Sequence, residues 1–253
     1  MAEYRWNQSE LAAGYNVGAT LVHPHYVEMQ DAILAEMAGA GATDGLVVDL
    51  GGGSGRLIER VLDRWPDTTA LIVDQSQAFL DLAASRLERF GERTSFVFRR
   101  LQEDWRGVVT QPAAAIVSMS AIHHLDPDEK QQCYQRCFDS LRPGGVLLNG
   151  DEVRAELDDV YREQVECWAE HMQTLIESEA VTPAMAEALR GWRKQNVEEF
   201  GGSRVSGDDC HETSDSQLGY FAQAGFEQTS VPWRRELWAL LKGVRVGSVD
   251  SSC

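Results

Sequence analysis

The sequence predicts an α/β fold in which helices cover both faces of a doubly wound, mostly parallel β-sheet. Apolar runs at residues 46–50, 70–74 and 113–119 have the length and composition of strands that are buried on both faces. Residues 57–62 have the apolar spacing of an amphipathic helix instead. Strands that alternate with helices in this way form parallel sheets. Ligands of such sheets bind outside the carboxyl ends of the strands.

Length, composition and charge limit the classes of protein. The chain has 253 residues, of which 43% are hydrophobic, and this fits one large domain. No apolar run approaches the ~20 residues of a membrane span, and residues 2–10 are too polar for a signal peptide. The five cysteines show no disulfide spacing, so we expect reduced thiols, a cytoplasmic location and no membrane partner. The net charge of −17 makes a nucleic-acid substrate unfavourable.

A glycine-rich turn follows the first predicted strand. It contains Gly51, Gly52, Gly53 and Gly55, and an acid, Asp49, precedes it. Glycine adopts positive φ values and lets the backbone approach a ligand closely. The helix that follows directs its free N–H groups toward that ligand. The spacing differs from the G-x-G-x-x-G pattern of dinucleotide-binding proteins, which disfavours an NAD-linked oxidoreductase.

Further motifs occur in order along the chain. Asp74 ends the second predicted strand, 23 residues after Gly51, where an acid accepts hydrogen bonds from ribose hydroxyls. The sequence His-His-Leu at 123–125 follows the fourth strand, and Leu-Arg-Pro-Gly-Gly at 141–145 precedes the fifth. With the glycine turn, these motifs resemble the class I methyltransferases that use S-adenosylmethionine (SAM), over roughly residues 45–150.

The resemblance carries expectations about fold and cofactor. It implies a seven-stranded, Rossmann-like sheet with an antiparallel last strand. It implies SAM as cofactor and S-adenosylhomocysteine (SAH) as product. Asp49 is then expected to orient the amino-acid end of SAM, and Phe79 to flank adenine. Gln75 belongs to the same pattern, and Gln102 or Glu103 is expected to contact adenine.

Other cofactor contacts are expected from topology and from aromatic content. Ser118 and Met119 end the fourth strand, so the carboxyl edge of the sheet brings them to the cofactor cleft. Trp6, Tyr15 and Tyr26 precede the first strand. Either this aromatic segment closes over a bound cofactor, or Tyr15 and Tyr26 fasten a peripheral helix to the core, and the sequence leaves both roles open.

The chain is expected to form a single methyltransferase domain, residues 1–253, in four parts. Residues 1–44 form lid helices, residues 45–152 the cofactor-binding core, and residues 213–253 the completion of the sheet. Residues 153–212 interrupt the sheet after its fifth strand, and their apolar spacing predicts a helical cap over the acceptor site.

Acids dominate the cap and favour one type of acceptor. Residues 151–212 hold 16 acids and 6 Lys or Arg, a net charge of 6 − 16 = −10, which favours a neutral or cationic small molecule. A base is needed only if that acceptor loses a proton. We expect it among His124, His171, Asp151 and Glu152, with His123 and His211 as further candidates. Each has a structural alternative: a histidine in the core, or an acid that caps a helix.

The sequence leaves two alternatives to methyl transfer open. One is an enzyme that forms or uses carboxy-SAM, and the other is a non-catalytic SAM-binding module. A homodimer is also possible on the sequence. No metal site is expected, because Pro24 holds His23 and His25 on extended backbone without a nearby ligand, and Cys167 and Cys210 lack a metal-binding motif.

Overall fold

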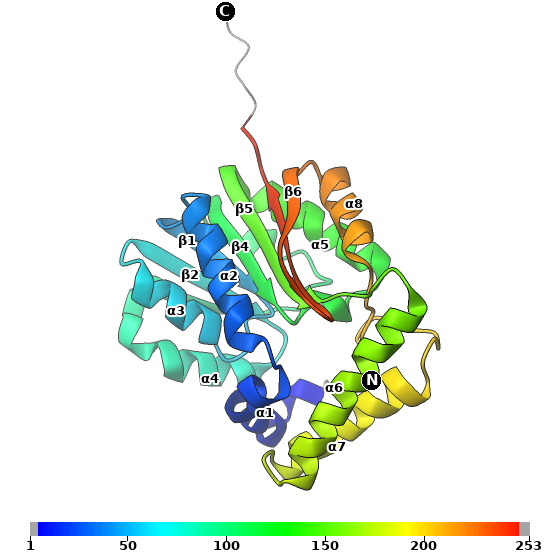
Figure 1. Cartoon of the computed structure of the whole chain (residues 1–253). Helices are drawn as coiled ribbons and strands as arrows, with labels where there is room; N and C mark the ends of the chain where they lie inside the picture. Colours follow the sequence, from blue (N-terminus) through cyan, green and yellow to red (C-terminus); the bar gives the residue numbers. More distant parts are fainter. Residues whose placement is uncertain (1–4, 248–253) are drawn as a thin grey trace, which may run out of the picture.

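The computed structural model describes residues 5–247 and confirms the α/β fold with a doubly wound sheet (Figure 1). Seven strands form one sheet in the order β3-β2-β1-β4-β5-β7-β6. β1 to β5 pair in parallel, and β7 runs antiparallel to both β5 and β6. The strands are β1 (Gly45–Leu50), β2 (Thr68–Asp74), β3 (Thr94–Phe98), β4 (Ala113–Met119), β5 (Leu141–Glu152), β6 (Glu227–Arg235) and β7 (Trp238–Val244).

Helices lie on both faces of this sheet and beyond its carboxyl edge. The α-helices are α1 (Ser9–Val22), α2 (Tyr26–Gly39), α3 (Arg56–Arg64), α4 (Gln77–Leu87), α5 (Pro127–Ser140), α6 (Asp158–Glu177), α7 (Pro183–Arg193) and α8 (Ser214–Ala224). The 3-10 helices are η1 (Arg5–Asn7), η2 (Glu88–Arg93), η3 (Arg106–Val108) and η4 (Ile122–His124), and η5 (Lys194–Glu198) is a π-helix. None of the described helices is both long and apolar enough to cross a membrane.

Alternate strand residues feed two apolar cores, one on each face. Val47 packs into the core under α2, α3 and α4, whereas Val48 packs into the core under α5 and α8. Both side chains are fully buried. Because both faces of these strands are buried, their sequences are continuous apolar runs and do not alternate between apolar and polar residues.

Helix starts follow the local sequence. Asp126 caps α5: its Oδ1 accepts a hydrogen bond from the Glu129 N–H, and its own N–H donates one to Glu129 Oε2. Pro127 takes the first helical position, where no N–H is needed. Ser76 and Thr182 cap α4 and α7 in the same way, each through a side-chain oxygen.

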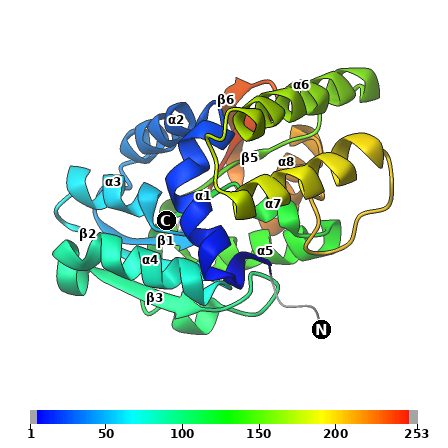
Figure 2. The same cartoon turned by 90° about the horizontal axis from the view of Figure 1, so that it is seen from below.

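Helices α6 and α7 pack beside α1, which also contacts α4 (Figure 2). Trp168 of α6 donates from its indole to the Val22 carbonyl at 2.8 Å. The apolar residues at the start of α6 do not join its buried face, because Leu157, the N-cap, and Val160 are exposed. The buried residues of α6 are instead Tyr161, Val165, Trp168, Ala169 and Met172.

Candidate functional site

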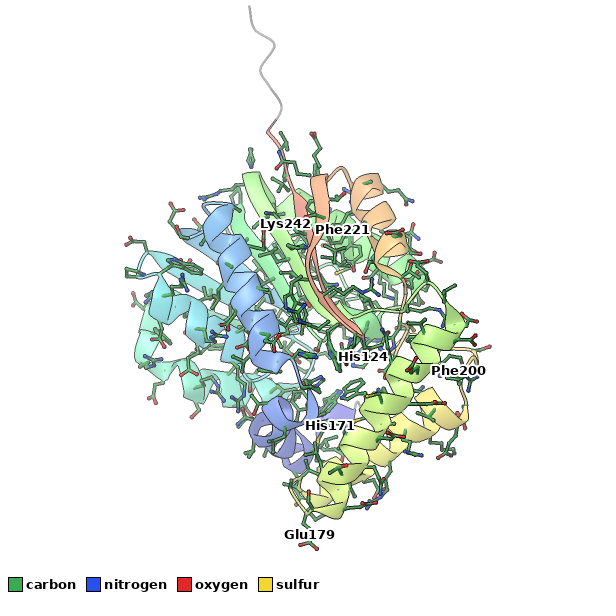
Figure 3. The ribbon with its side chains drawn as sticks, viewed as in Figure 1. His124, His171, Glu179, Phe200, Phe221 and Lys242 are labelled. Atoms are coloured by element: carbon green, nitrogen blue, oxygen red, sulfur yellow. The ribbon has the colours of Figure 1, made fainter. Side chains whose placement is uncertain are left out.

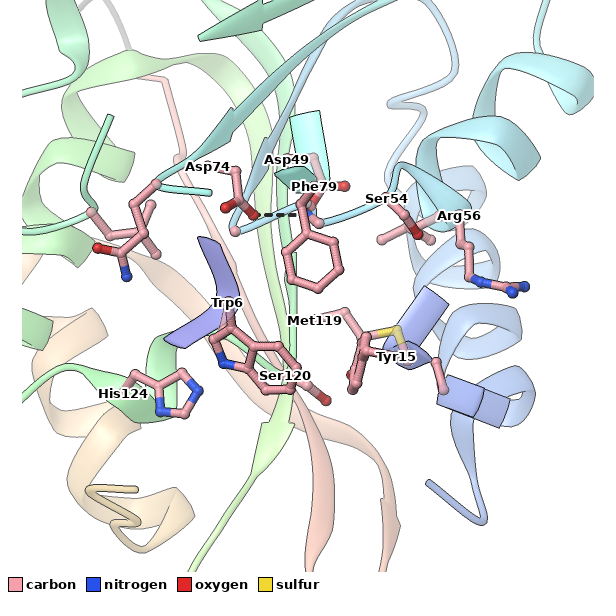
Figure 4. Close-up of a pocket in the computed structure, with 18 of the residues that line it drawn as sticks. Trp6, Tyr15, Asp49, Ser54, Arg56, Asp74, Phe79, Met119, Ser120 and His124 are labelled. Atoms are coloured by element: carbon pink, nitrogen blue, oxygen red, sulfur yellow. Dashed lines mark hydrogen bonds between the residues drawn. The ribbon is translucent and has the colours of Figure 1, made fainter. Parts of the chain in front are cut away.

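The first cavity lies at the carboxyl ends of β1, β2 and β4 (Figure 4). Predicted residues that line it are Tyr15, Asp49, Gly51, Gly52, Gly53, Asp74, Gln75, Phe79, Gln102, Met119 and His124. Its wall also contains side chains that sequence reasoning did not assign to the cofactor, among them Gln30, Arg56 and Ser120. Ser120 directly follows β4, so its place on the sheet edge was available as a signal.

The glycines of the turn serve different physical needs. Gly51 has φ +69°, and a Cβ there would lie 2.4 Å from the Ala121 Cβ, so the turn has no room for a side chain. Gly53 has φ +53°, and a Cβ there would meet no protein atom within 4 Å. Gly55 does not line the cavity, and a Cβ there would lie 3.0 Å from Leu87 Cδ1 of α4. Gly53 thus presents bare backbone to the cavity.

Two buried carboxylates stand beside this turn. Asp74 Oδ2 accepts a hydrogen bond from the Gly53 N–H at 2.9 Å, and its Oδ1 accepts one from the Ser76 N–H at 2.8 Å. Burial raises the pKa of Asp74 to about 6, against the lowering effect of these two bonds. Burial and the charge of Asp74 raise the pKa of Asp49 to about 8. The cavity is therefore ready to accept positive charge or hydrogen-bond donors.

Aromatic rings from η1, α1 and α4 form one wall of the cavity. The ring centroids of Trp6 and Phe79 are 5.8 Å apart, and those of Tyr15 and Phe79 are 5.9 Å apart. Tyr15 also donates a hydrogen bond to His23 Nε2 at 3.0 Å when that nitrogen carries the lone pair. Tyr15 thus lines the cavity, and its ring also contacts Trp6 of η1 and Phe79 of α4, which fastens α1 to these elements.

Besides Gly55, two predicted cofactor residues do not line the cavity. Ser118 is fully buried, and its hydroxyl donates to the Leu50 carbonyl at 2.8 Å, between β4 and β1. Glu103 is exposed and lies 3.8 Å from the Arg99 guanidinium. Of the two alternatives for adenine, only Gln102 reaches the wall, where its amide donates to Ser206 Oγ at 3.0 Å.

A second cavity adjoins the first beneath α6 and α7. Its walls share Trp6, Tyr15, Ser120 and His124 with the first cavity. The helices α6 and α7 contribute apolar side chains, namely Trp168, Met172, Met185, Ala188, Leu189 and Trp192. The polar wall is formed by His23, His123, Glu152, Asp209 and His211. Lys and Arg do not occur among its described lining residues.

His123 forms the centre of the polar wall. Its Nδ1 donates to Asp151 Oδ1 at 2.6 Å and lies 2.9 Å from Glu152 Oε2. Burial acts to lower the pKa of His123, but the charges of Asp151 and Glu152 outweigh it and raise that pKa well above its usual value. Burial raises the pKa of Asp151. In Glu152 the opposing effect of His123 prevails over burial and holds the pKa well below its usual value.

Asp209 belongs to the same wall and was not predicted. Its Oδ1 lies 3.3 Å from His124 Nδ1 and 3.7 Å from His123 Nε2. Burial opposes ionisation of Asp209, but the hydrogen bond and charge of His124 hold its pKa below the usual range. Burial lowers the pKa of His211 to about 4, and its Nδ1 lies 2.7 Å from the Tyr161 hydroxyl.

The four predicted catalytic residues are not all brought together. His124 and Glu152 line the second cavity, and Asp151 lies directly behind His123. The prediction that His171 points into the site is wrong. Its Nε2 bonds to the Leu21 carbonyl at 2.7 Å, at the junction of α6 and α1 (Figure 3), and it lines neither cavity. The helical spacing of His171 correctly predicts an inward direction, but the side chain contacts α1 and not the second cavity.

In a comparison with known protein families, residues 47–145 match the model of a family described as a methyltransferase domain. The chain is 27% identical to a carboxy-S-adenosyl-L-methionine synthase from Desulfotalea psychrophila, over 56% of this chain and 58% of that one. It is 30% identical to a 23S rRNA (guanine(748)-N(1))-methyltransferase from Streptomyces fradiae, over 51% of this chain and 42% of that one. The chain thus spans about half the length of these curated relatives.

Solved structures share the fold at low sequence identity. An O-methyltransferase family protein from Burkholderia thailandensis superposes with a TM-score of 0.63 at 19% identity, covering 93% of this chain and 60% of that one. The magnesium protoporphyrin IX methyltransferase of Synechocystis, with SAH bound, superposes with a TM-score of 0.55 at 14% identity, covering 86% of this chain and 82% of that one.

Proposed function

Residues 47–145 form a class I methyltransferase domain, and from this premise we propose that the protein transfers the methyl group of SAM to a small-molecule acceptor. The observation that carries the proposal is the meeting of two cavities at Ser120 and His124. One cavity has the carboxylates that suit the cofactor, and the other has an apolar and acidic wall that suits an acceptor. The methyl group is passed where they meet.

SAM fits the first cavity by the chemistry of its groups. Asp74 accepts hydrogen bonds from the ribose hydroxyls, and Asp49 faces the ammonium group of the methionine part. Phe79 and Trp6 flank adenine, and Gln102 supplies a polar contact at its edge. Gly53 leaves the space through which the cofactor passes the turn, as its open Cβ position indicates.

The acceptor occupies the second cavity, under a cap formed by residues 153–212. Methyl transfer is an in-line displacement, so the enzyme holds the nucleophile at about 3–3.5 Å from the methyl carbon and keeps water away. Trp168, Met172 and Trp192 supply the apolar cover. A cap that contributes one wall of the acceptor cavity positions the acceptor without any covalent catalyst.

The charge of the second cavity selects among acceptors. Glu152 and Asp209 face it, and no Lys or Arg lies among its described lining residues, so a neutral or cationic acceptor is favoured over an anionic one. Where the acceptor loses a proton, His124 and Glu152 are the predicted residues that line the cavity. Asp151 acts through His123, whose ring it orients. A cytoplasmic location and a homodimer remain predictions.

The test combines binding with turnover. Calorimetry is expected to show binding of SAM and SAH to the purified protein, and Asp74→Asn is expected to weaken both by about 10- to 100-fold through loss of a charge-assisted pair. Transfer of labelled methyl from SAM is then measured with a panel of neutral and cationic hydroxyl and amine acceptors. Absence of SAM binding contradicts the proposal. Binding without transfer to any member of the panel favours a non-catalytic SAM-binding module.

Formation of carboxy-SAM is the second candidate, because a curated relative carries that name. Such a reaction needs a bound carboxylate donor, and a carboxylate is best held by a cation. Arg56 is the described cationic side chain on the wall of the first cavity, and none occurs on the second. Mass spectrometry of the cofactor after reaction distinguishes the two candidate reactions, since methyl transfer yields SAH and the second candidate yields carboxy-SAM.

A further inference from the structure

We propose that His123, His124 and Asp209 form a binding site for a first-row divalent metal ion, at the junction of the two cavities. The ligand atoms His123 Nε2, His124 Nδ1 and Asp209 Oδ1 belong to a group whose members all lie within 4.8 Å of one another. Two imidazoles and one carboxylate suit Mn²⁺, Fe²⁺ and Zn²⁺. This set leaves coordination positions open toward the cavities.

Backbone pairing fixes the two segments that supply these ligands. The Cys210 N–H donates to the His123 carbonyl at 2.8 Å, and the Gly207 N–H donates to the His124 carbonyl at 2.8 Å. The loop after η5 is thereby held against η4, although about 85 residues separate them in the sequence. The backbone thus holds the two segments that carry the ligands next to each other.

Each of two ligands has a supporting hydrogen bond behind it. His123 Nδ1 donates to Asp151 Oδ1 at 2.6 Å, and its Nε2 lies on the side of Asp209. A bound metal ion takes the place of the proton on Nε2, while the proton on Nδ1 stays with Asp151. Asp151 is itself held by the His123 N–H at 2.9 Å. Asp209 Oδ2 accepts from the Asn196 amide at 3.0 Å. Carboxylates behind histidines and donors behind carboxylates are the usual support of metal ligands.

The surrounding charge also calls for a cation. Asp151, Glu152 and Asp209 are each at most 4% exposed, and the described ion pairs of all three are with histidines alone. His211 lines the same cavity, and its buried Nε2 has no hydrogen-bond partner. Buried carboxylates are stable only when paired or bound to metal. A divalent ion adds two positive charges beside these three acids.

The ion would bind an acceptor atom on its open side. Ser120 and His124 line both cavities, so an oxygen or nitrogen bound there stands next to the cofactor cavity. That role rests on the proposed methyl transfer, whereas metal binding does not. A metal-bound acceptor is consistent with a neutral hydroxyl compound rather than a cationic one.

Metal binding is tested on the full chain after chelator treatment and dialysis. Titration with Mn²⁺, followed by the loss of the free-ion electron paramagnetic resonance signal, is expected to show one saturable site. Asp209→Asn and His123→Ala are expected to abolish it, and Asn196→Ala to weaken it by about 10- to 100-fold. His25→Ala is the matched control, because His25 pairs with Glu28 outside the cluster and keeps the site intact.

Two further measurements keep the result decisive. Pulsed resonance of the Mn²⁺ complex is expected to show nitrogen coupling from imidazole, which does not depend on any variant that fails to fold. SAM calorimetry on Asp209→Asn is expected to match the wild type, so loss of metal binding is distinguished from failure of the cofactor site. Absence of a saturable site, absence of nitrogen coupling, or an alkylammonium ion that binds in place of Mn²⁺ overturns the proposal.

Discussion

At the scale of single residues, the unusual feature of the cofactor cavity is that two neighbouring acids, Asp49 and Asp74, are both buried. In the absence of a ligand, Asp49 is held with a pKa of about 8 and Asp74 with one of about 6. Both values exceed the ~3.9 of an unfolded aspartate. The folded protein therefore binds protons more tightly than the unfolded chain in this pH range.

The sign of the pH effect follows from this difference. Between about pH 4 and 8 the folded state holds more protons than the unfolded state, so the stability of the cofactor-free protein falls as the pH rises across this range. Asp49→Asn removes the part of this loss that comes from Asp49, whereas the part from Asp74 remains. We expect the variant to melt at a higher temperature than the wild type at pH 8, yet to bind SAM about 10- to 100-fold more weakly. Calorimetry and thermal melting across pH 5–9 measure both. Equal melting curves at pH 8 contradict the assignment of a raised pKa to Asp49.

Gly53 allows a second test at this scale, because its Cβ position is open. Gly53→Val is expected to lose SAM binding, since a branched side chain fills the space that the cofactor crosses. Its φ of +53° also costs about 1–2 kcal/mol for any L-residue. Gly91→Val is the matched control, with φ +55°, no protein atom within 4 Å of the Cβ, and a place in η2 that does not line either cavity. Normal SAM affinity in Gly53→Val contradicts the placement of the turn.

At the scale of elements, α6 is tied to α1 by two hydrogen bonds from its side chains. His171 and Trp168 bond to the carbonyls of Leu21 and Val22. His171→Ala removes one of these bonds and is expected to cost about 1 kcal/mol of stability while leaving SAM affinity and transfer per folded molecule unchanged. Thermal melting and activity assays on the same sample measure both. A variant of wild-type stability that no longer transfers methyl would return His171 to the acceptor site.

Elements with strong local signals were predictable from the sequence. The strand at Ala113–Met119 and the start of α5 at Asp126 and Pro127 follow from apolar length and from cap chemistry. The inward face of α6 was less predictable, because helical spacing says that a residue faces a neighbour but not which neighbour. For His171 that neighbour is α1, a contact that spans 150 residues of sequence.

Asp209 shows why part of the candidate site could not be read from the sequence. It lies in a loop without an apolar period, and it reaches His124 because Gly207 and Cys210 pair with the backbone of η4. Such pairing is decided by the packed structure, not by local preference. Asp49, Gly53 and Asp74 were predictable because the strand and the turn that carry them have strong local patterns.

At the scale of the whole molecule, residues 153–212 and the sheet share one apolar core. Trp168, Met185 and Trp192 belong to the same buried cluster as Val47 and Trp238. We therefore expect a single cooperative unfolding transition in scanning calorimetry, because α6 and α7 have no separate core to retain. At a SAM concentration 100 times its dissociation constant, the folded state gains about 2.7 kcal/mol, which raises the transition temperature. A separate low-temperature transition would make residues 153–212 an independent unit.

The π-helix η5 has a consequence for the geometry of the site. It continues α7 at its carboxyl end, and single π turns are frequent at functional sites. Within this turn the Asn196 amide donates to Asp209 Oδ2 at 3.0 Å and to the Trp192 carbonyl at 3.2 Å. Deletion of Gln195 would rotate Asn196 by about 100° around the helix axis and turn its amide away from Asp209. The wide turn therefore acts as a spacer that sets the angle at which Asn196 meets Asp209.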